Sequence, residues 1–224
     1  MSPKYAWSFS ALNQYNTCAY QYYRLKIKKD VKDSMIEAAL WGNEVHKHLE
    51  HRLRHQTPLP ERFKQYEYLA RPFDAAKGVV LAEQKLTLNR NLDPTTWFAN
   101  DAWCRGIVDV TVLNEDSGRA FAGDWKTGKR KPDSDQLMLF AGLIFAHYEF
   151  IDRADTAFIW LKEKATDKET YTRDQEKDIW DHFFGKLKRL ENSLVKDTWP
   201  KKPSGLCKGW CPVRDCSYWE PKKT

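Results

Sequence analysis

Two apolar runs, each ending beside an acidic residue, most constrain how this chain can fold. The first run ends in Gly-Ile-Val-Asp109, and the second ends in Gly-Asp124-Trp-Lys-Thr-Gly-Lys. Asn114–Arg119, a segment rich in turn-forming residues, separates them and predicts a β-hairpin of strands Trp103–Leu113 and Arg119–Lys126. Because paired antiparallel strands bring their far ends together, we expect the two aspartates to face each other.

Two carboxylates at one point are costly unless a cation neutralises them. Hard oxygen ligands of this kind select Mg²⁺ or Mn²⁺. Asp124 and Lys126 are two residues apart on a strand, so both point to one face. Acids that hold a metal, with an ammonium group beside them, are what metal-assisted hydrolysis of a phosphodiester needs.

The alternative reading of these residues is a pair of solvated or salt-bridged acids and an ordinary surface lysine. Asp109 argues against it, because Val108 and Val110 flank this acid in an otherwise apolar strand. Charged groups are rarely buried without a partner. The sequence therefore favours a functional acid at this position, and the spacing of Lys126 from Asp124 extends that preference to the lysine.

Length and charge narrow the class of protein. With 224 residues, the default is a single domain over residues 1–224. No apolar run approaches the ~20 residues of a membrane span, and the first residues lack a signal-peptide pattern. We therefore expect a soluble, cytoplasmic protein without a membrane partner. The net charge of +6, with 37 Lys and Arg, favours a polyanionic partner.

The remaining hydrophobic pattern predicts an α/β fold in which a mixed sheet is flanked by helices, with a helical N-terminal part. Ser8 or Ser10 can cap the first helix. The expected helices run from there toward Lys26 and over Ser34–His55, Glu61–Ala76, Asp133–Tyr148 and Thr172–Lys196. Besides the hairpin, the expected strands are Val79–Leu88 and Ala157–Lys162.

The set Asp109…Asp124-x-Lys126 resembles the core of PD-(D/E)XK nucleases. The sequence Asp-Trp-Lys-Thr-Gly-Lys and the later sequence Asp-Gln-Leu-Met-Leu-Phe resemble motifs of the RecB-like branch, which includes phage exonucleases and CRISPR adaptation nucleases. The similarity extends from about Ser8 to Trp219. It implies a nuclease core and hydrolysis of DNA with Mg²⁺ or Mn²⁺.

The resemblance also implies further metal ligands. His46, in Gly-Asn-Glu-Val-His, matches the helix histidine of this branch, and an imidazole ligand would tilt the preference toward Mn²⁺. Glu83 matches a glutamate on the strand before the hairpin, and the backbone carbonyl of Trp125 is a further ligand. The alternatives are a half-buried histidine satisfied by hydrogen bonds and a polar position on an alternating strand.

Gln136 begins the segment that in the family reads Gln-x-x-x-Tyr. The resemblance assigns Gln136 a role in orienting Lys126 or a phosphate, whereas Phe140 replaces the tyrosine and lacks its hydroxyl. The basic run Lys129–Lys131 follows the same motif. It is either a solvated loop or a patch that holds a nucleic-acid backbone.

Cysteines are concentrated in the Cys-rich tail, residues 200–224. The spacing Cys207-x₃-Cys211-x₄-Cys216 points to a metal site rather than to disulfides in a cytoplasmic protein. By resemblance, Cys18 is the fourth ligand of a [4Fe–4S] cluster that clasps the tail onto the N-terminal helix. The spacing leaves Zn²⁺ or an empty site open, and Cys104 is expected to be a plain buried cysteine.

The main hypothesis is therefore a metal-dependent exonuclease that acts on DNA ends. One alternative is a non-catalytic nucleic-acid-binding module with a structural zinc or iron–sulfur site. Another is an endonuclease, which would cut closed circles. A homo-oligomer, or a partner protein of recombination or repair, is compatible with the sequence.

Overall fold

The computed structural model describes residues 5–33, 37–131 and 135–222. By its internal contacts the chain divides into two compact units. The sheet unit comprises residues 36–182, and the terminal unit comprises residues 1–35 together with 183–224. Among the described residues, none of the helices has the length and apolar character that a membrane span requires.

A five-stranded mixed sheet forms the centre of the sheet unit, which confirms the predicted α/β fold. The strands follow one another in the order of the sequence, and only β3 and β4 are parallel. Their bounds are β1 Val79–Leu88, β2 Cys104–Asn114, β3 Arg119–Lys126, β4 Arg153–Trp160 and β5 Ala165–Thr172. The hairpin strands β2 and β3 lie within one residue of the predicted bounds.

Strand β5 was missed by the sequence prediction, and part of it was placed in a helix. Its sequence, Ala-Thr-Asp-Lys-Glu-Thr-Tyr-Thr, is polar because β5 pairs only with β4 at the edge of the sheet. Thr172 ends this strand and caps the 3₁₀ turn Arg173–Gln175. The long helix α6 therefore spans Glu176–Lys196 instead of beginning at Thr172.

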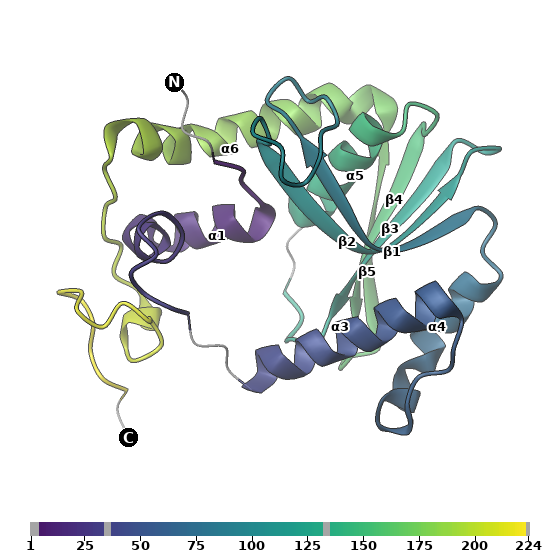
Figure 1. Cartoon of the computed structure of the whole chain (residues 1–224), viewed down its shortest axis with the longest axis horizontal. Coiled ribbons are helices and arrows are strands. Elements are labelled where there is room, and N and C mark those ends of the chain that lie inside the picture. The colour runs from purple at the N-terminus through teal and green to yellow at the C-terminus, as the bar shows by residue number, and fades with distance from the viewer. Residues whose placement is uncertain (1–4, 34–36, 132–134, 223–224) are drawn as a thin grey trace. The chain divides into compact units, whose positions relative to one another are not determined.

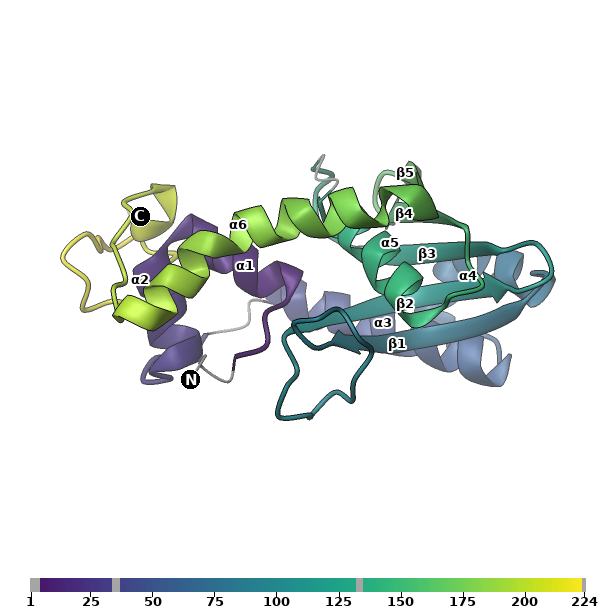
Figure 2. The ribbon, with the colours of Figure 1, turned by 90° about the horizontal axis from the view of Figure 1, so that it is seen from above.

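Helices cover both faces of the sheet. Helix α5, Asp135–His147, lies on one face and supplies the crossover between the parallel strands β3 and β4, whereas α3, Glu37–His55, and α4, Glu67–Asp74, lie on the other (Figure 1, Figure 2). A 3₁₀ helix, Glu61–Tyr66, replaces the first half of the third predicted helix. Residues 34–36 and 132–134, where two helices were predicted to begin, lie outside the described residues.

The core on the α3 face fixes the position of that helix. Val45 and Leu49 of α3 are buried against Val110 of β2 and Trp125 of β3. Arg52, one turn further along α3, is bound by Glu67 at 2.6 Å and by Asp74, both from α4. This packing sets the helix face that carries His46 against the middle of the sheet.

The terminal unit is helical and aromatic. Its helices are α1, Phe9–Thr17; α2, Ala19–Tyr22; a π-helix over Tyr23–Ile27; and the part of α6 beyond residue 182, followed by the 3₁₀ turn Gly205–Cys207. Ser8 caps α1 by accepting a hydrogen bond from the backbone N–H of Ala11, as predicted. Buried aromatic rings, among them Trp7 and Tyr22, fill its interior.

Candidate active site

Glu83 lies where the ladder between β1 and β2 is interrupted. Ala82 pairs with Val110 and Gln84 with Val108, so the register places Glu83 opposite Asp109. Glu83 has φ +49°, in the left-handed region that a glutamate rarely adopts. Such strain persists only where the surrounding structure holds it, and it is concentrated at functional sites. Arg54 of α3 helps to hold this backbone conformation, because it donates a hydrogen bond of 3.0 Å to the carbonyl oxygen of the preceding residue, Ala82.

His46, Glu83 and Asp109 form a cluster of metal-ligating groups. One ligand atom from each lies within 4.8 Å of the others. The Nδ1 atom of His46 is 3.3 Å from Oδ1 of Asp109. The other oxygen of Asp109 accepts a hydrogen bond of 2.7 Å from the backbone N–H of Trp125. The aspartate is thus oriented by β3 on one side and faces the α3 histidine on the other.

Asp124, Lys126 and Gln136 form a second set beside this cluster. The ladder of β2 with β3 ends where Val110 pairs with Gly123, so Asp109 and Asp124 are the residues just beyond its last pair, and the charge of Asp109 acts on Asp124. Lys126 Nζ lies 2.6 Å from Oδ2 of Asp124 and donates to the side-chain oxygen of Gln136 at 3.0 Å. The amide nitrogen of Gln136 donates to the other oxygen of Asp124, also at 3.0 Å. The ammonium group is therefore held in place from two directions.

The acids of the site are too close together and too buried to ionise freely. Burial, reinforced by the charge of Asp109, raises the pKa of Asp124 to about 6. Burial and the same neighbour raise the pKa of Glu83 to about 7. Burial alone would lower the pKa of His46, but its contact with Asp109 and the charges of Asp124 and Glu83 raise it. The site thus has an excess of negative charge that a bound cation would neutralise.

A divalent metal ion fits these residues. The donor set combines carboxylate oxygens with one imidazole, which suits Mg²⁺ and, with the nitrogen, Mn²⁺. Oδ2 of Asp124 is buried and makes no hydrogen bond of acceptable geometry with the residues that the structure describes, although the ammonium of Lys126 is near it. Buried polar atoms are normally satisfied, so this oxygen has bonding capacity left for a cation.

Stabilisation by a metal should depend on pH. Because the pKa values of Asp124 and Glu83 are raised in the folded state, the metal-free protein should lose stability as pH rises from about 4 to about 7. A cation needs the ionised carboxylates and should offset that loss. We therefore expect millimolar Mn²⁺ to raise the melting temperature at pH 8 but hardly at pH 5, measured by calorimetry. Equal increments at the two pH values, or an equal increment in Glu83→Gln, would contradict this assignment.

The structure brings together every residue predicted for the active site, but two contacts were not foreseen. The backbone N–H of Trp125 holds Asp109, whereas the prediction concerned its carbonyl. The ring of Phe158 lies 4.8 Å from Lys126 Nζ. This contact was missed because Phe158 lies on β4, which is distant in sequence from Lys126.

Two further predicted residues lie near the site motif in the sequence. Phe140 is buried, as an apolar core residue should be. In the basic run, Arg130 forms an ion pair with Asp167 of β5.

The four predicted cluster ligands line one pocket in the terminal unit. Cys18, Cys207, Cys211 and Cys216 all border it, and none forms a disulfide. The tail contacts the N-terminal helices around this pocket: Gln21 donates to the sulfur of Cys211 at 3.4 Å, and Arg24 pairs with Asp215 at 2.9 Å. Cys104 lies in the sheet unit and is fully buried, which raises the pKa of its thiol.

Comparisons with known proteins agree with this geometry. The profile of the PD-(D/E)XK nuclease superfamily matches residues 6–216. The crystal structure of SSO0001 is 14% identical, with a TM-score of 0.55, over 97% of this chain and 88% of that one. A structure from Eubacterium rectale that carries the provisional name exonuclease is 13% identical, with a TM-score of 0.54, over 96% and 86%. A search of curated protein sequences finds no significant match.

Proposed function

Because the chain belongs to the PD-(D/E)XK nuclease superfamily, we propose that it is a Mg²⁺- or Mn²⁺-dependent deoxyribonuclease of the RecB-like branch that degrades DNA from its ends. The observation that carries the proposal is a pair of neighbouring sets of side chains, whose charges act on one another, where the ladder of β2 and β3 ends at Val110 and Gly123. His46, Glu83 and Asp109 form one set, and Asp124, Lys126 and Gln136 form the other. The provisional name of the Eubacterium rectale protein supports an exonuclease over an endonuclease.

Each residue has a role in this proposal. His46, Glu83, Asp109, Asp124 and the carbonyl of Trp125 hold the metal ion. When bound, the ion polarises the phosphodiester and stabilises the charge that develops on it. Lys126 orients the attacking water and offsets negative charge in the transition state. Gln136 keeps the ammonium aimed at that position, through its bonds to Lys126 and Asp124.

A comparison of linear and closed circular DNA tests the mode of attack. An exonuclease should shorten end-labelled linear DNA in the presence of Mn²⁺ and leave a covalently closed circle intact. A nick introduced into the circle should make it a substrate. Cleavage of the intact circle at a rate similar to that of the linear form would establish the endonuclease alternative instead.

We propose further that Cys18, Cys207, Cys211 and Cys216 bind a [4Fe–4S] cluster. Their shared pocket and their free thiols support a bound inorganic group. One Zn²⁺ held by the same four thiolates is the alternative that the spacing leaves open. The cluster would tie the tail to the N-terminal helices.

Anaerobically purified protein should therefore be brown and contain about four irons per chain. Cys18→Ser should bleach it as completely as Cys211→Ser, although the two residues are at opposite ends of the sequence. Cys104→Ser is the matched control and should keep the colour, since this thiol lies in the other unit. Iron analysis and visible absorption measure the outcome. Colourless protein with one zinc per chain would contradict the cluster and leave the nuclease proposal standing.

A further inference from the structure

An exposed aromatic and basic surface continues from the candidate active site along β1 and β2. It consists of Lys85, Arg105 and Ile107 on the strands and of Trp97 and Phe98 in the loop between them. Along β2, Arg105, Ile107 and Asp109 alternate and therefore share a face. Lys85 pairs in register with Ile107 and lies two residues, about 7 Å, from Glu83. The surface thus begins directly beside the acids of the site.

Cations and aromatic rings are interleaved on this surface. Lys85 Nζ lies 5.6 Å from the centre of the Trp97 ring, and the guanidinium of Arg105 lies 5.5 Å from it. Arg105 is half-buried, and its Nε is covered and makes no hydrogen bond with the described residues, so only its partly exposed end faces solvent. Lys85 is exposed. Their positive charge complements a phosphate backbone, which is what a strand running toward a metal site would present.

Phe98 is the most exposed large apolar residue described, with 87% of its surface accessible. A single exposed apolar residue is common on a protein surface, so the place of Phe98, next to Trp97 and its two cations, is what points to a ligand. The loop that presents it is ordered by hydrogen bonds: Thr95 donates to the Thr87 carbonyl at 2.9 Å, and Trp103 to that of Leu88 at 2.8 Å. The acids of this loop, Asp93 and Asp101, already accept hydrogen bonds from Asn89 and Thr95.

We infer that this surface binds a single-stranded segment of nucleic acid next to the scissile phosphate. Phe98 stacks on an unpaired base. Lys85 and Arg105, which the ring of Trp97 positions, contact the phosphates on either side of that base. Bases in a duplex are already stacked and cannot reach an exposed ring, so the surface selects an unpaired end. This inference rests on the proposed function, because it names the form of DNA that the same site takes.

The test measures binding without hydrolysis. A fluorescein-labelled 12-nucleotide oligodeoxynucleotide is titrated with the full-length protein in EDTA, by fluorescence anisotropy, at several salt concentrations. Phe98→Ala should weaken binding about tenfold without changing the salt dependence, since stacking involves no counterions. Lys85→Ala should also weaken binding and reduce the slope of log K against log salt by about 0.7, the value for one phosphate of a single strand.

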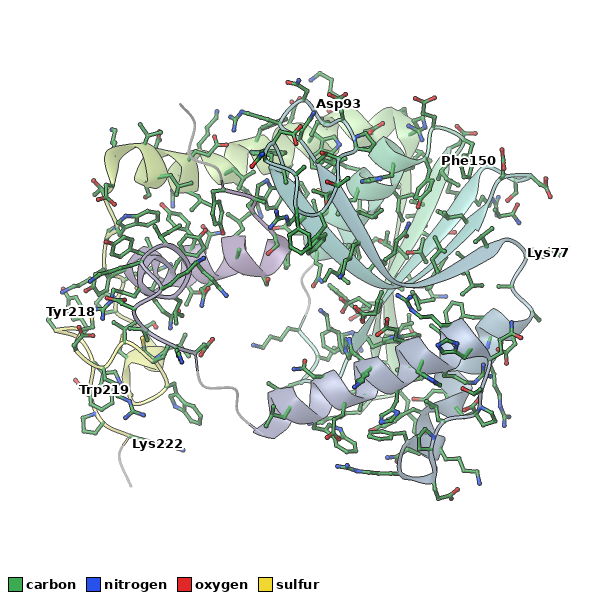
Figure 3. All side chains as sticks on the ribbon, viewed as in Figure 1. Lys77, Asp93, Phe150, Tyr218, Trp219 and Lys222 are labelled. Carbon is green, nitrogen blue, oxygen red and sulfur yellow. The ribbon has the colours of Figure 1, made fainter. Side chains whose placement is uncertain are left out.

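Matched controls come from the other end of the sheet. Phe150 is another exposed phenylalanine, and Lys77 is an exposed lysine just before β1; both lie away from the loop that carries Asp93 (Figure 3). Phe150→Ala and Lys77→Ala should bind the oligonucleotide as the unmodified protein does. A blunt duplex of the same sequence should bind more weakly and be insensitive to Phe98→Ala.

The inference is overturned if Phe98→Ala and Phe150→Ala bind the single strand equally, or if Phe98→Ala weakens duplex and single strand alike. Its failure is distinguishable from failure of the proposed function. Unchanged binding by the variants, with Mn²⁺-dependent hydrolysis intact, removes only the surface. Phe98-dependent binding without any hydrolysis would leave a single-strand-binding protein and remove the nuclease.

Discussion

Asp109→Asn should reduce DNA hydrolysis by at least ~10³-fold, since loss of a metal ligand removes several kcal/mol of transition-state stabilisation. Asparagine keeps the size of the side chain and retains an oxygen that can accept from the Trp125 backbone N–H. The fold should therefore survive, and the loss should be one of charge and of metal affinity. Asp124→Ala should have a similar effect on hydrolysis, because the same set of ligands is broken. The initial rate with saturating Mn²⁺ is the measurement.

The control for charge alone is Asp116→Ala. This acid is exposed in the turn between β2 and β3 and lies on the same hairpin, away from the site. It should hydrolyse DNA at the unmodified rate. Near-normal hydrolysis by both Asp109→Asn and Asp124→Ala, in protein that melts normally, would remove these acids from the mechanism.

Lys126→Ala should slow turnover by about 10²–10³-fold while the stabilisation by Mn²⁺ at pH 8 is retained. The lysine contributes an ammonium that Asp124 and Gln136 hold in place, and it is not a ligand of the metal. Lys126→Arg should not restore the rate. A planar guanidinium cannot replace a compact ammonium in a site where Nζ also lies 4.8 Å from the Phe158 ring.

Lys168→Ala serves as the control, because this exposed lysine of β5 lies on the edge strand of the sheet. Single-turnover rates separate chemistry from product release, and calorimetry with Mn²⁺ separates chemistry from metal binding. Full activity of the arginine variant would show that any positive charge suffices. Loss of Mn²⁺ stabilisation in Lys126→Ala would instead indicate that the lysine acts through the metal ligands.

The sequence predicted the hairpin closely because its signals are local. Asn114–Arg119 is rich in turn residues, and apolar strands flank it, so the bounds of β2 and β3 could be worked out from spacing alone, with Asp109 and Asp124 just beyond the last pair of their ladder. The edge strand β5 could not be recognised in the same way. Its outward positions are charged or Thr, and such residues signal a loop when only the sequence is considered.

Contacts between elements that are distant in sequence were the least predictable part of the site. The backbone conformation of Glu83, and the hydrogen bond from Arg54 to the carbonyl of Ala82, arise only when β1 packs against α3. The hydrogen bond from Trp125 to Asp109 depends on how β2 and β3 separate beyond Val110. Chemistry-bearing residue types can be identified from a motif, whereas the bonds that orient them depend on the packed fold.

Hydrolysis of linear DNA by the purified protein, with and without Mn²⁺, tests the central claim most directly. End-labelled linear DNA is incubated with the protein in EDTA, in Mn²⁺, and in Mn²⁺ with Asp109→Asn in place of the unmodified chain. We predict that the label is released in Mn²⁺ only, and that Asp109→Asn releases it at least ~10³-fold more slowly. Release at equal rates in EDTA and Mn²⁺, or the absence of release in Mn²⁺ by protein that Mn²⁺ stabilises, would contradict a metal-dependent nuclease.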